Sequence, residues 1–116
     1  MLCVWGALSG VAHAQDANHG RLVFNANCAV CHSATEGTAA RIGPNLFGVV
    51  GRHAGVVAGF SYSAAMRNSG IVWTTDSLQT FLRAPARAVP GTRMAFAGLH
   101  NDTQTADVVA YLQTLH

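Results

Sequence analysis

The sequence predicts an all-α protein made of short helices and long loops, and three observations lead to this fold class. No segment alternates apolar and polar residues over the length that a half-buried strand needs. Several short segments instead open with a helix-capping residue and continue with apolar residues at helical spacing. Glycines recur every few residues through 33–59 and interrupt regular structure there. With 116 residues, 50% of them hydrophobic and 10% charged, the chain fits one small globular domain.

Residues 1–14 are predicted to be a secretory leader, and residues 15–116 to be the domain itself. The leader is almost wholly apolar and ends in Ala12-His13-Ala14, a small-x-small cleavage pattern before a polar run. It is short and lacks a basic n-region, which a start site placed too far downstream would explain. A retained membrane anchor is the alternative, although the apolar run falls short of the ~20 residues that cross a bilayer. Cys3 belongs to this leader.

The first two helices are defined by their capping residues. The first is predicted to begin at Asp16 or Asn18 and to continue through residues 20–27. The long glycine-rich segment that follows is expected to form loops and turns. A short second helix is predicted over residues 63–70, because a serine cap opens it and a glycine ends it.

Two more helices are predicted in the second half. One opens at Asp76 with capping-box spacing to Gln79 and must end before Pro85. A loop is expected from residue 84 to about residue 100. The last helix opens at Asn101 with the same spacing. Its apolar stripe consists of Val108, Leu112 and Leu115, with Tyr111 beside them.

The pentapeptide Cys28-Ala29-Val30-Cys31-His32 is the strongest functional signal in the chain. Two thiols three residues apart, followed directly by a histidine, form the pattern that attaches a c-type haem. In helical conformation Cys28 and Cys31 lie one turn apart on the same face, so both sulfurs can reach the vinyl groups of one porphyrin. His32 then becomes a ligand of the iron. The sequence thus predicts one haem c, attached covalently through two thioethers.

A disulfide or half of a zinc site is the alternative interpretation of these cysteines. Zinc would need a second pair of ligands at metal-site spacing, and Cys3 is the only other cysteine. A buried porphyrin would also supply apolar contact that a domain of this size otherwise lacks. We therefore expect the chain without haem to be largely unfolded.

Met94 is the predicted second iron ligand. It follows Pro90-Gly91 in a non-helical loop, far along the chain from His32. A thioether is a soft, neutral ligand that favours reduced iron when it is bound opposite a histidine. An isolated methionine would otherwise be interpreted as a core side chain. A second axial histidine, His53 or His100, is a further alternative, whereas His19 and His116 are expected at the surface.

With these motifs in place, the sequence resembles the class I cytochromes c, the mitochondrial cytochrome c and bacterial cytochrome c2-type carriers. The resemblance covers nearly all of the domain, from about Gly20 to Leu115. It implies the cytochrome c fold, with short helices and loops wrapped around one haem. In order, the matching motifs are the pentapeptide, Gly43-Pro44-Asn45-Leu46 with Gly51-Arg52, Gly59-Phe60-Ser61-Tyr62, Gly70 to Trp73, the methionine loop and Ala110-Tyr111-Leu112.

The resemblance implies roles for residues around the haem. The carbonyl of Pro44 is expected to accept the outer N–H of the axial histidine. Arg52, Tyr62 and Trp73 match positions that neutralise or hydrogen-bond a buried propionate, and Thr92 is a further donor. Core packing of Trp73 and Tyr62, or a solvated Arg52, are the alternatives. Three other residues match the contact between the first and last helices: Gly20, Phe24 and Tyr111.

The docking surface departs from that of relatives with a ring of lysines. This chain has no lysine, and its seven basic residues are arginines that give a formal net charge of +2. Arg41, Arg87 and Arg93 fall where relatives carry the basic ring, so a reduced docking face is expected for donor and acceptor proteins. The modest charge and the absence of an aromatic-interleaved basic patch argue against nucleic-acid binding.

These observations predict a soluble, exported, monomeric one-electron carrier in the periplasm and not an enzyme. Two alternatives remain at this level. A haem peroxidase or gas-binding sensor would need a labile axial position. Phe81 favours that alternative slightly, since many relatives have there a tyrosine whose hydroxyl can bond the ligating sulfur. A dedicated electron-transfer subunit of one oxidoreductase would fit the low surface charge.

Overall fold

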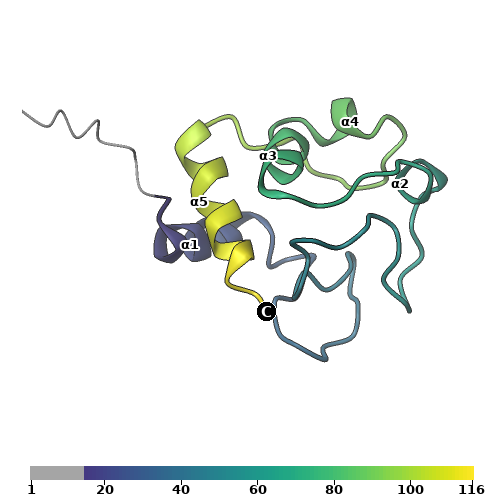
Figure 1. Cartoon of the computed structure of the whole chain (residues 1–116), viewed down its shortest axis with the longest axis horizontal. Coiled ribbons are helices and arrows are strands. Elements are labelled where there is room, and N and C mark those ends of the chain that lie inside the picture. Colours follow the sequence, from purple (N-terminus) through teal and green to yellow (C-terminus); the bar gives the residue numbers. More distant parts are fainter. Residues whose placement is uncertain (1–14) are drawn as a thin grey trace, which may run out of the picture.

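The computed structural model describes residues 15–116, and the predicted leader over residues 1–14 lies outside this range. Its helices are α1 (Ala17–Asn27), α2 (Ala64–Arg67), α3 (Thr75–Arg83), α4 (Pro85–Ala88) and α5 (Asp102–Gln113) (Figure 1). Within the described range, β structure is limited to one antiparallel bridge between His53 and Val72. The all-α prediction is confirmed. None of the described helices has the length and apolar character needed to span a membrane.

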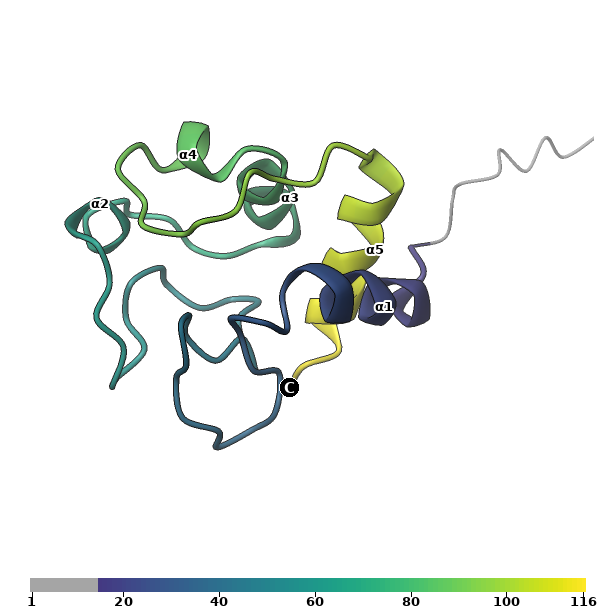
Figure 2. The ribbon, with the colours of Figure 1, turned by 180° about the vertical axis from the view of Figure 1, so that it is seen from behind.

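Helices α1 and α5 pack against each other near the two ends of the described chain, as both views show (Figures 1 and 2). Gly20 allows the close approach, because a Cβ at this position would lie 1.8 Å from the carbonyl oxygen of Asp107. Next to it, the rings of Phe24 and Tyr111 pack with centroids 5.3 Å apart. The predicted contact between the first and last helices is confirmed.

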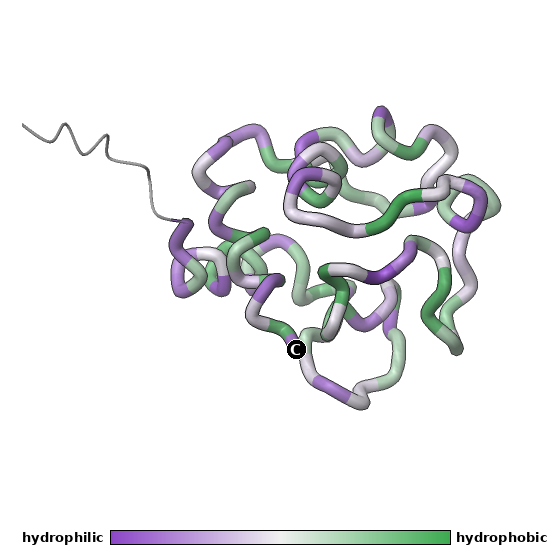
Figure 3. The backbone as a smooth tube through the Cα atoms, in the orientation of Figure 1, coloured by the Kyte–Doolittle hydropathy of each residue, from purple (hydrophilic) through white to green (hydrophobic). Residues whose placement is uncertain are grey.

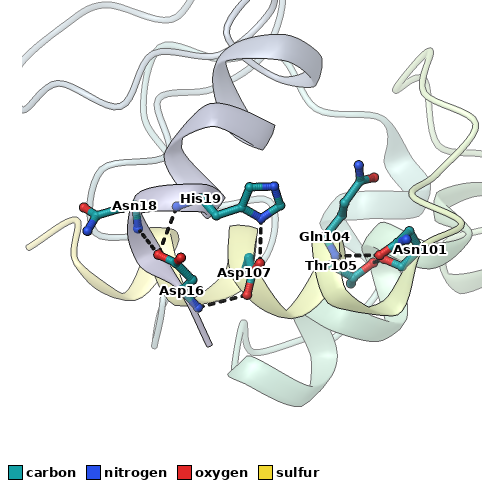
Figure 4. A network of polar contacts seen from close by, with 7 residues as sticks. All are labelled: Asp16, Asn18, His19, Asn101, Gln104, Thr105 and Asp107. Carbon is teal, nitrogen blue, oxygen red and sulfur yellow. Dashed lines mark hydrogen bonds and ion pairs between the residues drawn. The ribbon is translucent and has the colours of Figure 1, made fainter. Parts of the chain in front are cut away.

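A polar network fastens the start of α1 to α5 (Figure 4). Of the two predicted caps, Asp16 is the one that caps α1, and it accepts the backbone N–H groups of Asn18 and His19. The buried carboxylate of Asp107 accepts the backbone N–H of Asp16 at 2.9 Å, and its other oxygen lies 2.6 Å from Nδ1 of His19. His19 is exposed, as expected, yet its ring is bound to a buried group. This network fixes where the chain enters the domain.

The boundaries of α3 and α4 differ from the prediction. Thr74, not Asp76, caps α3: its hydroxyl accepts the N–H of Ser77, whose hydroxyl accepts the N–H of Thr74. Serine thus replaces the glutamate or glutamine of the usual capping box. Helix α4 lies in a segment that was predicted to be a loop. Its first residue, Pro85, ends the preceding helix and also provides the φ angle that starts a new one.

Long loops connect this helical frame. Residues 33–59 contain no helix, as predicted, and α2 is a single turn capped by the hydroxyl of Ser63. Hydrophobic and hydrophilic residues interleave along these loops, without long apolar stretches (Figure 3). The helices and loops share one apolar core, which includes Val23, Phe24, Val49, Trp73, Leu78, Phe81, Leu82, Val108, Val109 and Leu112.

Candidate functional site

A cavity of about 410 Å³ lies between the loops and the helical frame. It brings together most of the residues predicted for the site, although they come from distant parts of the sequence. These are Cys31, His32, Pro44, Arg52, Tyr62, Trp73, Thr92 and Met94. A smaller cavity of about 80 Å³ is lined by Cys28 together with Cys31, His32 and Met94.

The pentapeptide forms one extra helical turn at the end of α1. Cys28 is the C-cap, and its carbonyl accepts the backbone N–H of both Cys31 and His32, at 3.0 and 2.9 Å. The two thiols are therefore one turn apart, as the spacing predicts, and neither forms a disulfide within the described chain. Burial, with a smaller contribution from Cys31, raises the pKa of Cys28 to about 11, so this thiol is neutral at pH 7.

His32 is held at both its backbone and its ring. Its Nδ1–H donates to the carbonyl of Pro44 at 2.8 Å, and Gly43 packs so closely that a Cβ there would lie 2.3 Å from His32 Cε1. Burial lowers the pKa of His32, which favours the neutral imidazole. Because Nδ1 carries the bonded hydrogen, Nε2 retains the lone pair that a metal ligand needs.

A second set of residues, which we call the methionine wall, consists of α2, α3 and residues 91–95. Met94 lies here, and its backbone N–H donates to the hydroxyl of Thr92 at 3.2 Å. The loop then runs directly beneath α3, since a Cβ on Gly98 would lie 2.3 Å from the carbonyl oxygen of Arg83. Phe81 of α3 packs edge-on to Trp73 with centroids 5.0 Å apart, and both rings line the cavity.

The remaining predicted residues give the cavity several hydrogen-bond donors. Arg52 donates to the carbonyl oxygens of Asn45 and Phe47, and burial lowers its pKa. The hydroxyl of Tyr62 accepts the N–H of Val57 and keeps its own O–H to donate. The hydroxyl of Thr92 likewise accepts the N–H of Met94 and keeps its own O–H to donate, and Trp73 contributes an indole N–H. No Asp or Glu lines the cavity, so these donors suit an anionic group.

Some cavity residues were not assigned a role by the sequence. Met66 lines the cavity on α2, and a lone methionine gives no signal in sequence that separates a site residue from the core. Of the two histidines predicted as alternative iron ligands, His53 lines the larger cavity and His100 lines neither cavity.

All three predicted docking arginines are exposed, and two of them are held by backbone carbonyls: Arg41 by Ala29 and Arg93 by Ser61.

The donor set fits a c-type haem. Two thiols lie one turn apart, a neutral imidazole and a thioether line both cavities, and hydrogen-bond donors without a competing carboxylate are available for propionates. Gly43 leaves the space that the His32 ring occupies. Among the described residues, no three His, Cys, Asp or Glu side chains converge as a bare metal site would need.

Comparison with known proteins agrees with this chemistry. The model of the Cytochrome c family matches residues 17–116. The chain is 43% identical to a cytochrome c2 of Blastochloris viridis over 97% of this chain and 87% of the relative. It is 42% identical to a cytochrome c2 of Rhodopila globiformis (91% and 99% coverage) and 43% identical to a cytochrome c of Guizotia abyssinica (88% and 92%). The chain therefore belongs to the cytochrome c family, whose members are electron-transfer proteins with one covalently attached haem c.

Proposed function

We propose that this chain carries single electrons between larger redox proteins, with His32 and Met94 as iron ligands and Cys28 and Cys31 as the attachment points. The observation that carries the proposal is the cavity that His32 and Met94 both line. Bound haem supplies a one-electron iron couple, and the protein supplies ligands, burial and a docking face.

The loop that contains Gly43 and Pro44 holds His32 in position. Its Nδ1–H bond to Pro44 holds the ring plane and increases the electron density at Nε2. Pro44 suits this role because its rigid φ angle limits movement of the carbonyl. The backbone of Met94 is placed by the hydrogen bond that its N–H donates to the hydroxyl of Thr92. Ligands that are already in position need little rearrangement when the oxidation state changes, and small rearrangement favours fast electron transfer.

Arg52, Tyr62, Trp73 and Thr92 would serve the propionates. Each retains an N–H or O–H that can donate, and a buried carboxylate without such donors would be costly. The guanidinium of Arg52 is also the only cation among these four side chains. Its charge raises the reduction potential, since a nearby cation disfavours the more positive oxidised iron.

The docking face is proposed to surround the haem edge, with Arg41, Arg87 and Arg93 contacting donor and acceptor proteins. The carbonyls that hold Arg41 and Arg93 lower the entropy lost when a partner carboxylate binds. A net charge of only +2 implies weak electrostatic steering. We further propose that the protein is exported to the periplasm, on the basis of the cleavage pattern that ends at Ala14, and that it acts there as a monomer.

Optical spectra of the purified haem protein in both oxidation states test the ligation. We expect the weak red band of iron–methionine ligation in the oxidised form and a reduced spectrum that carbon monoxide leaves unchanged. Met94→Ala should lose the band and bind carbon monoxide, whereas His53→Ala and His100→Ala should keep the wild-type spectrum. Rapid carbon monoxide binding by the wild type, or loss of the band in His53→Ala, would contradict the proposal and favour a ligand-binding haem or a histidine ligand.

A further inference from the structure

Met66 is a second thioether in the cavity that holds Met94. It is half-buried, belongs to the single turn α2, and packs against the apolar core as well as lining the cavity. Its position is fixed locally, because its backbone N–H donates to the capping hydroxyl of Ser63 at 3.1 Å. The proposed ligation leaves this sulfur without a role.

Two contacts place Met66 beside the loop that carries Met94. A Cβ on Gly91 would lie 3.2 Å from the Cβ of Ala65, the neighbour of Met66 on α2. The guanidinium of Arg93 donates to the carbonyl of Ser61 at 3.0 Å. Residues 61–66 are therefore packed on residues 91–94, whereas His32 is bonded and packed to residues 43–44.

A thioether side chain in this position keeps water out of this part of the cavity. Leu78 and Phe81 of the methionine wall already line the cavity, and so does Trp73, which packs against Phe81. The Met66 side chain has no N–H or O–H group, and its sulfur is a weak acceptor, so it offers water little to bind. A dry surrounding disfavours the iron state with the greater charge, which is the oxidised one.

We propose that Met66 is a positioning residue that keeps water away from the sulfur of Met94. It thereby raises the reduction potential and slows replacement of Met94 by an external ligand. This inference depends on the proposed ligation by His32 and Met94.

The test compares two haem-containing variants that differ in polarity at this position. Met66→Gln keeps the length of the side chain but adds an amide that binds water, and Met66→Leu keeps the side chain apolar. We expect Met66→Gln to lower the reduction potential and to bind cyanide in the oxidised state at least about tenfold faster than the wild type. Met66→Leu should remain within about twofold of the wild type in cyanide binding, as an apolar replacement of similar volume disturbs a site little. Met66→Asn serves as the polar variant if Met66→Gln fails to incorporate haem.

Two controls separate this role from general destabilisation and from failure of the ligation itself. Gly37→Ala, whose new Cβ would meet no atom within 4 Å, should lower stability through its φ of +76° without changing the reduction potential or cyanide binding. A polar variant with the wild-type potential and cyanide rate would overturn the proposal, as would Met66→Leu behaving like Met66→Gln. A wild-type oxidised spectrum without the iron–methionine band would instead overturn the ligation. Because that spectrum is recorded first, the two failures are distinguishable.

Discussion

The ring of His32 and the backbone of Gly43 are in direct contact, so that a Cβ at position 43 would lie 2.3 Å from His32 Cε1. The same segment supplies the Pro44 carbonyl that accepts Nδ1–H of His32. Residues 43–44 therefore determine both the position of the His32 ring and which of its two nitrogens carries the hydrogen.

Gly43→Ala tests this contact. The added methyl group must displace the ring or the loop, and we expect a loss of about 1–3 kcal/mol in the free energy of unfolding, as for other overpacked sites. The oxidised spectrum should change at the same time, because the displaced ring is the proposed ligand. Gly37→Ala should lower stability by about 1–2 kcal/mol through its positive φ alone and leave the spectrum unchanged. Equal spectra for the two variants would show that the contact is unimportant.

Asp107→Ala should weaken the junction of α1 and α5. Removing the buried carboxylate leaves the N–H of Asp16 and the ring of His19 without this acceptor, and we expect a loss of about 2–3 kcal/mol. Asp102→Ala is the matched control on the same helix. Its carboxylate is 88% exposed and pairs with Arg83 at 3.3 Å, so the loss should stay below about 1 kcal/mol. Denaturant titrations of both variants measure the difference.

Gly20→Ala should be more harmful than its effect on helix propensity suggests. In an exposed helix this substitution stabilises by about 1 kcal/mol, whereas here the new Cβ would overlap the carbonyl of Asp107 at 1.8 Å. We expect net destabilisation by about 2 kcal/mol or more and a lower yield of haem protein. Asn25→Ala, at an exposed position of α1, should be neutral or slightly stabilising. Thermal unfolding should show a lower midpoint for Gly20→Ala and an unchanged or slightly higher midpoint for Asn25→Ala.

Arg52→Met should lower the reduction potential. The substitution removes a half-buried cation from the cavity, and a nearby positive charge disfavours the oxidised iron. It also removes the donors to the carbonyls of Asn45 and Phe47, so stability should fall. Arg52→Lys keeps the charge but loses the planar guanidinium. Its reduction potential should therefore stay near the wild-type value, whereas its stability should still fall. An unchanged reduction potential in Arg52→Met would show that the charge of Arg52 does not act on the iron.

The chain without haem should be largely unfolded. The cavity of about 410 Å³ is lined mainly by apolar side chains, and keeping it open without haem would be costly. The marginal stability of a small domain does not cover that cost. The Cys28→Ala/Cys31→Ala protein, purified without haem, should lose most of its far-ultraviolet helical signal and regain part of it when haem is added. A cooperative thermal transition in the protein without haem would contradict this expectation.

The sequence was most informative where one side chain determines local geometry. Asp16, Ser63 and Asn101 cap their helices as predicted, since each oxygen accepts an N–H from the first turn that follows. The start of α3 was misplaced because Thr74 and Ser77 form a reciprocal pair without the usual glutamate or glutamine.

The start of α4 and some residues of the cavity could not be predicted from local sequence patterns. Pro85 was interpreted only as a helix stop, although it also begins a helix. Met66 lines the cavity only because segments distant in the sequence pack together. Spacing along the chain carries no signal for such packing, whereas the pentapeptide and the methionine loop are recognisable by their local chemistry.

The packing of α5 on α1 also joins the two ends of the described chain. The carboxylate of Asp107, on the last helix, holds the backbone N–H of Asp16, so the start of α1 is fixed only when α5 is in place. A chain that stops before α5 would therefore carry the attachment segment, residues 28–32, on a first helix without its packing partner.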